Sequence, residues 1–220
     1  AGWAARRPRA QQLAARREGL SARSPSAAAG SSSPRPAPGD LPVVKGSEIV
    51  YDGFMRLRQD VLEVPGGESM TWLSLLSSPQ GAVILAEDKE GRLILTEEYR
   101  PPLRQYCLGV PGGIVDPGEN PCEAAARELL EEAGFVVDVG DMQVAGTYQN
   151  VPGIMAQEVV VVLGRGARPA PSSRPEGDEI MPVRTLLLTP AQAIARMRDN
   201  TIPVDANLAG AFFYYLADRA

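Results

Sequence analysis

Three glutamates in the middle of the chain have the spacing at which side chains on one helix face become neighbours. Glu128, Glu131 and Glu132 stand at positions i, i+3 and i+4 within GGIVDPGENPCEAAARELLEEAGF, residues 112–135. Like charges at this spacing repel one another, but their oxygens can also converge on one point beside the helix. Hard divalent cations such as Mg²⁺ bind through such oxygens. The spacing therefore fits a metal site, and it also fits a solvated acidic helix face.

The helix that must carry these glutamates has clear start and stop signals. Asn120 is a favourable N-cap, Pro121 suits the first helical position, and Glu123 completes a capping box. Gly134 is a residue type that commonly ends helices. We therefore predict a helix over residues 121–133. The residues expected on its apolar face are Cys122, Ala125, Ala126, Leu129 and Ala133.

A longer pattern surrounds the glutamates. Residues 113–135 satisfy G-x5-E-x7-R-E-U-x-E-E-x-G-U, where U is aliphatic or aromatic, at every fixed position. The chain therefore resembles the Nudix hydrolases. This resemblance implies an α/β fold, a Nudix-type α/β/α sandwich with a mixed sheet. It also implies a hydrolase that acts on nucleoside diphosphates linked to another group.

The resemblance further implies roles for individual residues of this pattern. The metal ligands would be Glu128, Glu131 and Glu132, with the carbonyl group of Gly112 as an additional ligand. The expected cofactor is Mg²⁺, with Mn²⁺ as an alternative. The metal would neutralise the pyrophosphate and activate a water molecule, which also makes Glu131 a catalytic residue. The remaining pair, Arg127 and Glu119, would orient the loop and the helix.

A general base must come from residues other than histidine, because the chain contains none. This absence excludes Ser-His and Cys-His mechanisms and every His-ligated zinc site. The resemblance implies an acidic residue in a long loop, which we expect over residues 164–179. Glu179 is the first choice, with Glu176 and Asp178 as alternatives. At least two of the three are expected to be ordinary solvated loop residues.

Similarity outside the box extends from about residue 42 to residue 218 and points to the ADP-ribose/ADP-sugar pyrophosphatase-like branch. It implies that Arg100 contacts a phosphate, for which a guanidinium group is well suited. Pro152 lies near the position of a proline found in that branch. Trp72 is a candidate for stacking against adenine, although aromatic residues on strands more often belong to the core.

Two positions depart from the pattern of this branch. Gly109 stands where many members have glutamate, and Gln157 stands where an acidic residue is expected, with Glu158 one place further along. We therefore include Glu158 among the substrate-binding candidates. The departures concern the choice of substrate rather than the reaction.

The remaining elements are predicted from local signals. Thr189, Pro190 and Gln192 are expected to start one helix through a capping box. The last helix, residues 205–218, should bury Leu208, Phe212, Tyr215 and Leu216 on one side. Strands without strict βαβ alternation predict a mixed sheet with helices packed on it. The segments expected to form strands or hairpins are 48–76 with a turn at 65–67, 81–99, 142–148, 158–164 and 180–188.

The N-terminal segment, residues 1–40, differs in composition from the domain expected over residues 41–220. It carries seven Arg against Glu18 and Asp40, a net charge of +5, whereas the rest carries 15 basic and 25 acidic residues, a net charge of −10. An Arg-rich, Ser-rich and acid-poor segment is typical of a transit peptide, so we expect a mitochondrial or plastid protein, and a cytoplasmic one otherwise. A disordered tail and a basic RNA-contacting arm are the alternatives.

Composition also limits the partners. No run approaches the 18 apolar residues that would indicate a membrane span, and the acidic domain disfavours a broad nucleic-acid surface. We expect a nucleoside diphosphate-linked small molecule as the substrate, and a homodimer is compatible with the family. The alternatives are a pyrophosphohydrolase acting on the 5′ end of RNA and a non-catalytic Nudix-fold binding module.

Overall fold

The computed structural model describes residues 37–53, 55–76, 80–171 and 183–220. By compactness the chain divides into two units, Ala1–Leu41 and Pro42–Ala220. Within the described part of the first unit, a short 3-10 helix, η2, covers Pro38–Asp40. All other elements belong to the second unit. The predicted transit peptide or tail, apart from its last four residues, lies outside the described residues.

The second unit begins with a three-stranded antiparallel sheet. Its strands are β1 (Val43–Asp52), β2 (Arg56–Glu63) and β3 (Ser69–Leu76), in the order β1-β2-β3. The predicted turn at Gly66 and Gly67 is confirmed, because both glycines have positive φ angles, 107° and 86°. Positive φ is costly for residues with a side chain, which explains the two glycines.

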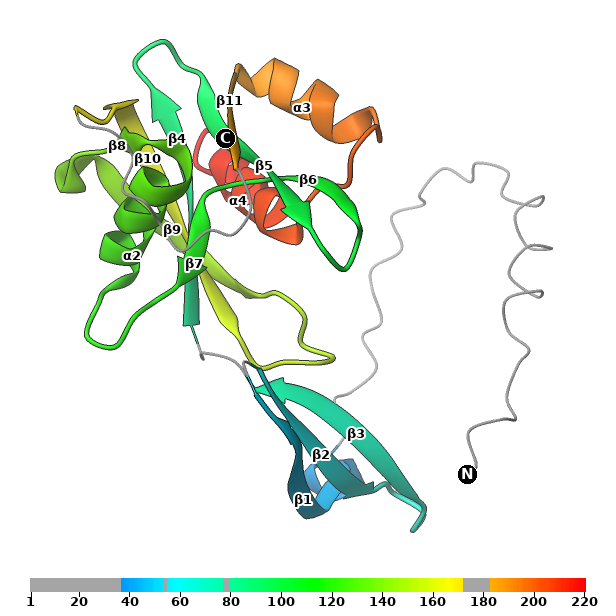
Figure 1. Cartoon of the computed structure of the whole chain (residues 1–220). Coiled ribbons are helices and arrows are strands. Elements are labelled where there is room, and N and C mark those ends of the chain that lie inside the picture. Colours follow the sequence, from blue (N-terminus) through cyan, green and yellow to red (C-terminus); the bar gives the residue numbers. More distant parts are fainter. Residues whose placement is uncertain (1–36, 54, 77–79, 172–182) are drawn as a thin grey trace. The chain divides into compact units, whose positions relative to one another are not determined.

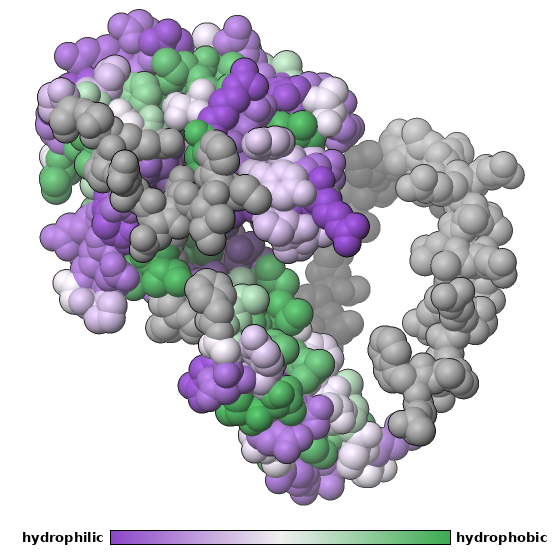
Figure 2. All heavy atoms as spheres, in the orientation of Figure 1, coloured by the Kyte–Doolittle hydropathy of each residue, from purple (hydrophilic) through white to green (hydrophobic). Residues whose placement is uncertain are grey.

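Both faces of this sheet are largely exposed. All ten residues of β1 are exposed, and Figure 2 shows hydrophobic side chains on the surface of this part of the molecule. A core of its own is therefore missing from the sheet. Its exposed large hydrophobic residues are Val43, Val44, Ile49, Val50, Tyr51, Val61, Met70, Trp72 and Leu73.

The main sheet is mixed and has eight strands. Its order is β11-β5-β4-β10-β8, and β6, β7 and β9 pair with β5, β4 and β10, respectively. The pair β4–β10 is parallel and forms the centre. The strands are β4 (Gln80–Asp88), β5 (Leu93–Arg100), β6 (Gln105–Gly109), β7 (Gly112–Ile114), β8 (Phe135–Val136), β9 (Met142–Gln149), β10 (Glu158–Pro169) and β11 (Arg184–Leu188).

Helices cover both faces of the main sheet (Figure 1). On one face lie α2 (Pro121–Glu128) and its continuation η3 (Leu129–Ala133), which bury Ala124, Ala125 and Leu129. The opposite face packs against α3 (Pro190–Arg198) and α4 (Ala206–Ala217). The predicted α/β/α sandwich with a mixed sheet is confirmed. Among the described residues, no helix is both long enough and apolar enough to cross a membrane.

The two central strands are apolar on both sides because both sides are covered by helices. In β4, Val83 and Leu85 belong to the cluster under α4, whereas Ile84 belongs to the cluster under α2. In β10, Val161 and Val162 are divided in the same way. Successive side chains of each strand therefore point to opposite faces, so that the same two strands contribute to the apolar clusters under α2 and under α4.

Near the predicted active site, β4 changes its neighbour. It pairs with β5 only at Ala86 and Glu87, close to its end. Toward its start, residues 81–83 pair instead with β7, the short strand that begins the Gly-rich loop. The loop is thereby fixed to the central strand by backbone hydrogen bonds.

Two sequence predictions are corrected here. The loop predicted over residues 164–179 begins later, because β10 continues to Pro169. Its last residues pair with β8, Arg168 with Val136 and Pro169 with Phe135. This long-range pairing outweighs the Gly- and Pro-rich composition. The second correction concerns α4, where Leu216 was predicted to be buried but is 49 % exposed.

The other α4 residues predicted to be buried are buried, and the predicted start of α3 is confirmed. Leu208, Phe212 and Tyr215 lie in the core. The Thr189 side chain accepts a hydrogen bond from the backbone N–H of Gln192, which completes the predicted capping box. Local capping signals therefore identified this helix correctly.

Candidate active site

The helix of the box starts and ends at the predicted residues, but its last turn is wound differently. The Asn120 side chain accepts hydrogen bonds from the N–H groups of Cys122 (3.0 Å) and Glu123 (3.1 Å), and Gly134 ends the helix with a φ of 73°. The last turn, η3, is a π-helix, so the predicted regular α-helix over residues 121–133 is wrong in this turn. A π-turn is wider than an α-turn and is often found at functional sites.

The wider turn changes the direction of two glutamates. Glu131 and Glu132 lie in η3, whereas Glu128 is the last residue of α2. Their relative directions therefore differ from those expected at 100° per residue.

Arg127 is the centre of the polar network. Its Nε and Nη2 atoms donate to the two carboxylate oxygens of Glu119, both at 3.1 Å, and Nη2 also donates to the carbonyl of Ile114 at 3.0 Å. Its Nη1 donates to Glu128 at 2.7 Å and to Glu131 at 3.2 Å. The guanidinium group thus makes five hydrogen bonds, and the arrangement agrees with the orienting role that the resemblance implies for the pair Arg127 and Glu119.

The structure brings two of the three predicted ligands together at one atom. Glu128 and Glu131 meet at Nη1 of Arg127, whereas Glu132 accepts a hydrogen bond from the N–H of Gly112 at 3.1 Å. Among the described residues, no group of three or more acidic, cysteine or histidine side chains has an arrangement that could hold a metal ion. The predicted convergence of three carboxylates is therefore absent from this structure. The contact shown for Gly112 is made by its N–H rather than by its carbonyl.

The chemistry of this donor set nevertheless fits a hard divalent cation. Burial raises the pKa of Glu128, hydrogen bonding and charge from Arg127 oppose that rise, and the charge of Glu131 adds to it. A cation would favour the ionised form of such a carboxylate. The hydrogen bonds from Arg127 lower the pKa of Glu119, and the same contacts, with smaller contributions from Glu128, raise the pKa of Arg127.

Gly113 is required by the close approach of a carboxylate. A Cβ atom at this position would lie 2.1 Å from Oε1 of Glu128. Gly112 is equally confined, because its Cβ would lie 2.7 Å from the carbonyl oxygen of Ala82. The two glycines therefore allow β7 to lie between the central strand and the glutamates.

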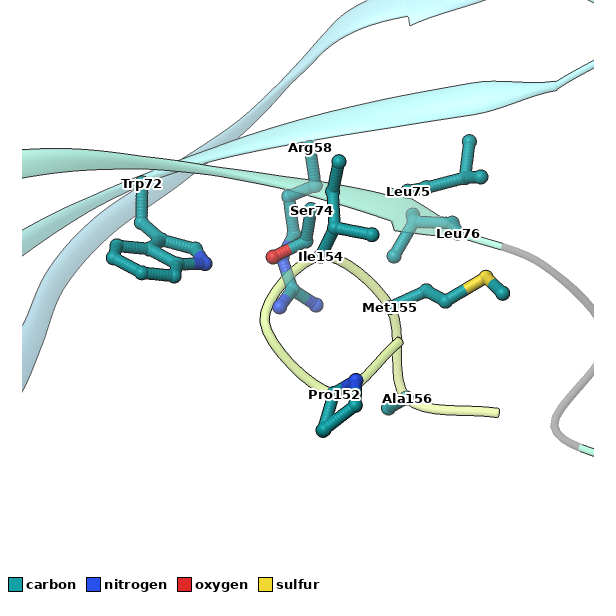
Figure 3. A pocket seen from close by; sticks show the side chains of 9 residues that line it. All are labelled: Arg58, Trp72, Ser74, Leu75, Leu76, Pro152, Ile154, Met155 and Ala156. Carbon is teal, nitrogen blue, oxygen red and sulfur yellow. The ribbon is translucent and has the colours of Figure 1, made fainter. Parts of the chain in front are cut away.

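Trp72 and Pro152 line one cavity, which has a volume of 190 Å³ and does not include the glutamates of the box. The cavity lies between β3 and the loop that follows β9 (Figure 3), which are joined by a hydrogen bond of 2.7 Å from the N–H of Leu75 to the carbonyl of Ile154. Trp72 is 42 % exposed, so the alternative that it is a core residue is wrong. Arg58 and Ser74 also line this cavity, and neither has a signal in the sequence that marks it as a site residue.

Arg100 lies at the end of β5 among acidic side chains. Its Nη1 donates to Glu98 at 2.7 Å, and its Nη2 lies 3.8 Å from Asp205, the N-cap of α4. Burial raises the pKa of Glu98, and the charge of Arg100 opposes that rise. No contact between Arg100 and the box is present among the described residues. Sequence reasoning missed Asp205, although its place before an apolar helical segment is a cap signal.

The remaining candidates are not part of the box network. Glu158 accepts a hydrogen bond from the side chain of Gln80 at 3.1 Å, at the start of β10. The three general-base candidates, Glu176, Asp178 and Glu179, lie outside the described residues.

With this geometry in view, the comparisons with known proteins assign the chain to a family. The profile described as NUDIX domain matches residues 78–208. The chain therefore belongs to the NUDIX domain family, and the comparisons indicate a Nudix hydrolase.

Individual relatives and one solved structure show what the chain is similar to. The ADP-sugar pyrophosphatase of Mus musculus is 30 % identical over 180 residues, which cover 73 % of this chain and 82 % of that protein. The methanol dehydrogenase activator of Bacillus methanolicus is 25 % identical over 123 residues, or 56 % of this chain and 65 % of the activator, just under two thirds of its length. A crystal structure of an ADP compounds hydrolase has a TM-score of 0.69 at 24 % identity and covers 82 % of this chain and 96 % of the other. At that identity, the structural likeness establishes the fold.

Proposed function

We propose that this protein is a Mg²⁺-dependent hydrolase that cleaves the pyrophosphate bond of an ADP-ribose or ADP-sugar type nucleoside diphosphate derivative. The observation that carries the proposal is the Arg127 network, which ties Glu119, Glu128 and Glu131 to the loop of a complete Nudix box. The ADP-sugar pyrophosphatase name of a relative that matches 73 % of the chain supports the choice of substrate. Mn²⁺ is the alternative metal.

Each residue has a defined task in this reaction. The metal would be held by Glu128, Glu131 and Glu132, and it would supply charge neutralisation and an acidified water. Arg127 holds the first two carboxylates in place through Nη1, at 2.7 and 3.2 Å. Glu179 is proposed to accept the proton of the attacking water, with Glu176 and Asp178 as alternatives.

The other substrate contacts are proposed outside the box. Trp72 stacks against the adenine, and Pro152 forms the opposite wall of the same cavity. Arg100 contacts a phosphate, for which it must turn from Glu98. Glu158 remains a candidate contact at the start of β10.

A substrate panel with Mg²⁺ tests this proposal. It contains ADP-ribose, ADP-glucose, NADH, a diadenosine polyphosphate and 5′-triphosphorylated RNA, and hydrolysis is followed by chromatography of the nucleotide products. We expect the highest kcat/KM for ADP-ribose or ADP-glucose. Preferential cleavage of the RNA would favour the second candidate function, which the +5 charge of residues 1–40 supports. A folded protein that hydrolyses none of them would favour a non-catalytic binding module.

We also propose that the protein forms a homodimer through its three-stranded sheet. Apolar residues on both faces of the sheet are exposed, including Ile49, Val50 and Leu73, and large exposed apolar patches commonly mark interfaces. Light scattering during size-exclusion chromatography should give twice the monomer mass. A monomer at micromolar concentration would contradict the proposal.

The N-terminal segment is proposed to direct the protein to mitochondria or plastids. The support is its Arg-rich and acid-poor composition. A fluorescent fusion of residues 1–40 should enter one of these organelles. A fusion that stays in the cytoplasm would contradict this assignment.

A further inference from the structure

A second cavity, of 150 Å³, adjoins the loop of the box and is lined by amide side chains. Residues 81–83 and 112–114 line it together with Val159, and its polar side chains are Asn150, Gln157 and Asn207. These amides come from three places in the sequence: the end of β9, the start of β10 and the first turn of α4. Among the described residues that line this cavity, none has an ionisable side chain.

The Asn207 amide is held in one orientation by a neighbouring tyrosine. The hydroxyl of Tyr148 lies 2.7 Å from Oδ1 of Asn207 and donates to it. Burial, together with the charge of Asp205, raises the pKa of Tyr148, so the hydroxyl keeps its proton. The tyrosine ring is itself confined, because a Cβ on Gly210 would lie 2.8 Å from it. The Asn207 oxygen thus accepts a hydrogen bond, and its amide nitrogen donates to none of the described residues, which leaves its two N–H donors for a ligand.

The cavity shares part of its wall with the metal-binding candidates. Gly112 and Gly113 line it, and the same two residues contact the carboxylates of Glu132 and Glu128. The cavity and the two carboxylates therefore share contacts with the same two glycines. Neither glycine has a side chain that could separate the two regions.

The chemistry of the lining selects the class of ligand. Side-chain amides offer both donors and acceptors without net charge, which matches hydroxyl groups. Among the described lining residues, none carries a charge that would bind an anionic group.

We propose that Asn207 is a specificity-determining residue, which together with Gln157 binds hydroxyl groups of a sugar attached to the distal phosphate. This inference rests on the proposed function and deepens it, because it assigns residues to the sugar rather than to the nucleotide. It applies to ADP-ribose and ADP-glucose alike, since both carry a hydroxyl-rich sugar in that place.

The test compares three substrates of the full-length protein: ADP-ribose, ADP-glucose and the β-methyl ester of ADP, which has no distal sugar. Asn207→Ala should lower kcat/KM for the two sugar substrates by about fivefold, the factor given by the loss of about one net hydrogen bond. It should leave kcat/KM for the methyl ester unchanged. Gln143→Ala is the matched control, because this amide lies on β9 and donates to Asp218 (3.3 Å), outside the cavity. It should change none of the three values.

A second variant separates a contact from a structural effect. Tyr148→Phe removes the hydroxyl that orients Asn207 but keeps the ring, so it should lower the same two values by a smaller factor. An equal loss for all three substrates, or no loss in either variant, would overturn the inference while leaving the proposed function intact. A wild-type protein that hydrolyses none of the three would overturn both. Circular dichroism of each variant verifies the fold, and Tyr148→Phe decides the matter if Asn207→Ala does not fold.

Discussion

At the level of single residues, the Glu128 carboxylate can approach the loop closely because Gly113 has no side chain. A Cβ at this position would lie 2.1 Å from the carboxylate oxygen, so Gly113→Ala must displace Glu128. A displacement of about 1 Å in an active site can cost about 100-fold in rate, and we expect a loss of this size in kcat/KM. Mg²⁺ affinity, measured by calorimetry, should fall as well.

Gly140→Ala is the control for this variant. A Cβ at Gly140 would meet no atom within 4 Å, so its activity should match the wild type, and its free energy of unfolding should stay within about 0.5 kcal/mol. Unchanged metal affinity in Gly113→Ala would contradict the placement of Glu128 beside the site.

Glu131→Gln should affect function far more than stability. The residue makes one contact with Arg127, at 3.2 Å, and such partly exposed ion pairs contribute about 0–1 kcal/mol. The free energy of unfolding without metal should therefore change by no more than about 1 kcal/mol. Activity should fall by more than the roughly 10- to 100-fold that loss of a residue supporting a metal ligand causes. Wild-type hydrolysis of ADP-ribose at saturating Mg²⁺ would remove Glu131 from the ligand set.

Glu179→Gln tests the proposed general base. Removal of such a base typically lowers the rate by about 10²–10⁴-fold, and we expect this loss in kcat with little change in KM or in metal affinity. Glu176→Gln and Asp178→Asn are the matched controls and should each have smaller effects. Equal and mild effects from all three would place the base elsewhere, with Glu158 as the next candidate.

At the level of elements, local signals identified those parts whose determinants are contiguous in the sequence. The caps at Asn120 and Thr189 fixed two helix starts correctly. The predictions failed where a distant partner decides the outcome. The end of β10 at Pro169 depends on β8, and the cavity near the box depends on Asn207, which the chain brings from α4. The π-turn at η3 has no signal in the spacing of the glutamates.

In the candidate site, too, local patterns were predicted and contacts between distant segments were not. The box pattern identified Glu119, Arg127 and Glu128 as one group, because their spacing lies within one loop and one helix. Their mutual hydrogen bonds are present in the structure. The pattern did not reveal Arg58 beside Trp72, since no local signal links two positions on different strands. Tertiary pairing alone creates that neighbourhood.

The turn between β4 and β5 offers a test of stability against pH. Asp88 is buried and accepts hydrogen bonds from the backbone N–H of Arg92 (2.8 Å) and of Glu90 (3.0 Å), and from Nε of Arg92 (2.7 Å). Burial alone would raise the pKa of Asp88, but these hydrogen bonds together hold it below its usual value of 3.8. At pH 7, Asp88→Asn should cost about 1.5–3 kcal/mol, the range for hydrogen bonds to charged groups.

The sign of the pH dependence follows from the lowered pKa. The contribution of Asp88 is fully present above its usual pKa of 3.8 and is lost as the pH falls through its lower folded value. The difference in free energy of unfolding between wild type and Asp88→Asn should therefore shrink in acid, as measured by urea denaturation. Glu90→Gln, at an exposed position in the same turn, should show no such dependence. A constant difference down to pH 2.5 would contradict this account.

At the level of the whole molecule, the two units are expected to have separate roles. The second unit, Pro42–Ala220, contains every strand and α-helix of the described chain. A protein that starts at Leu41 should therefore fold and hydrolyse small nucleotides with unchanged kcat/KM. A large loss of activity would show that the N-terminal segment contributes to the domain, and an RNA substrate would reveal whether the basic segment assists binding.

The central parallel pair of the sheet also determines when the protein can fold during its synthesis. The ribosome releases β4 and the box helix well before β10, yet the buried face of that helix packs on Val160 and Val162 of β10. Until Val160 and Val162 have left the ribosome, Ala125 and Leu129 lack part of the apolar surface against which they pack in the folded protein. Contacts between distant segments form late and leave apolar surface exposed in the meantime. A nascent chain that already contains the whole Nudix box therefore still exposes the apolar face of the box helix until β10 has been made.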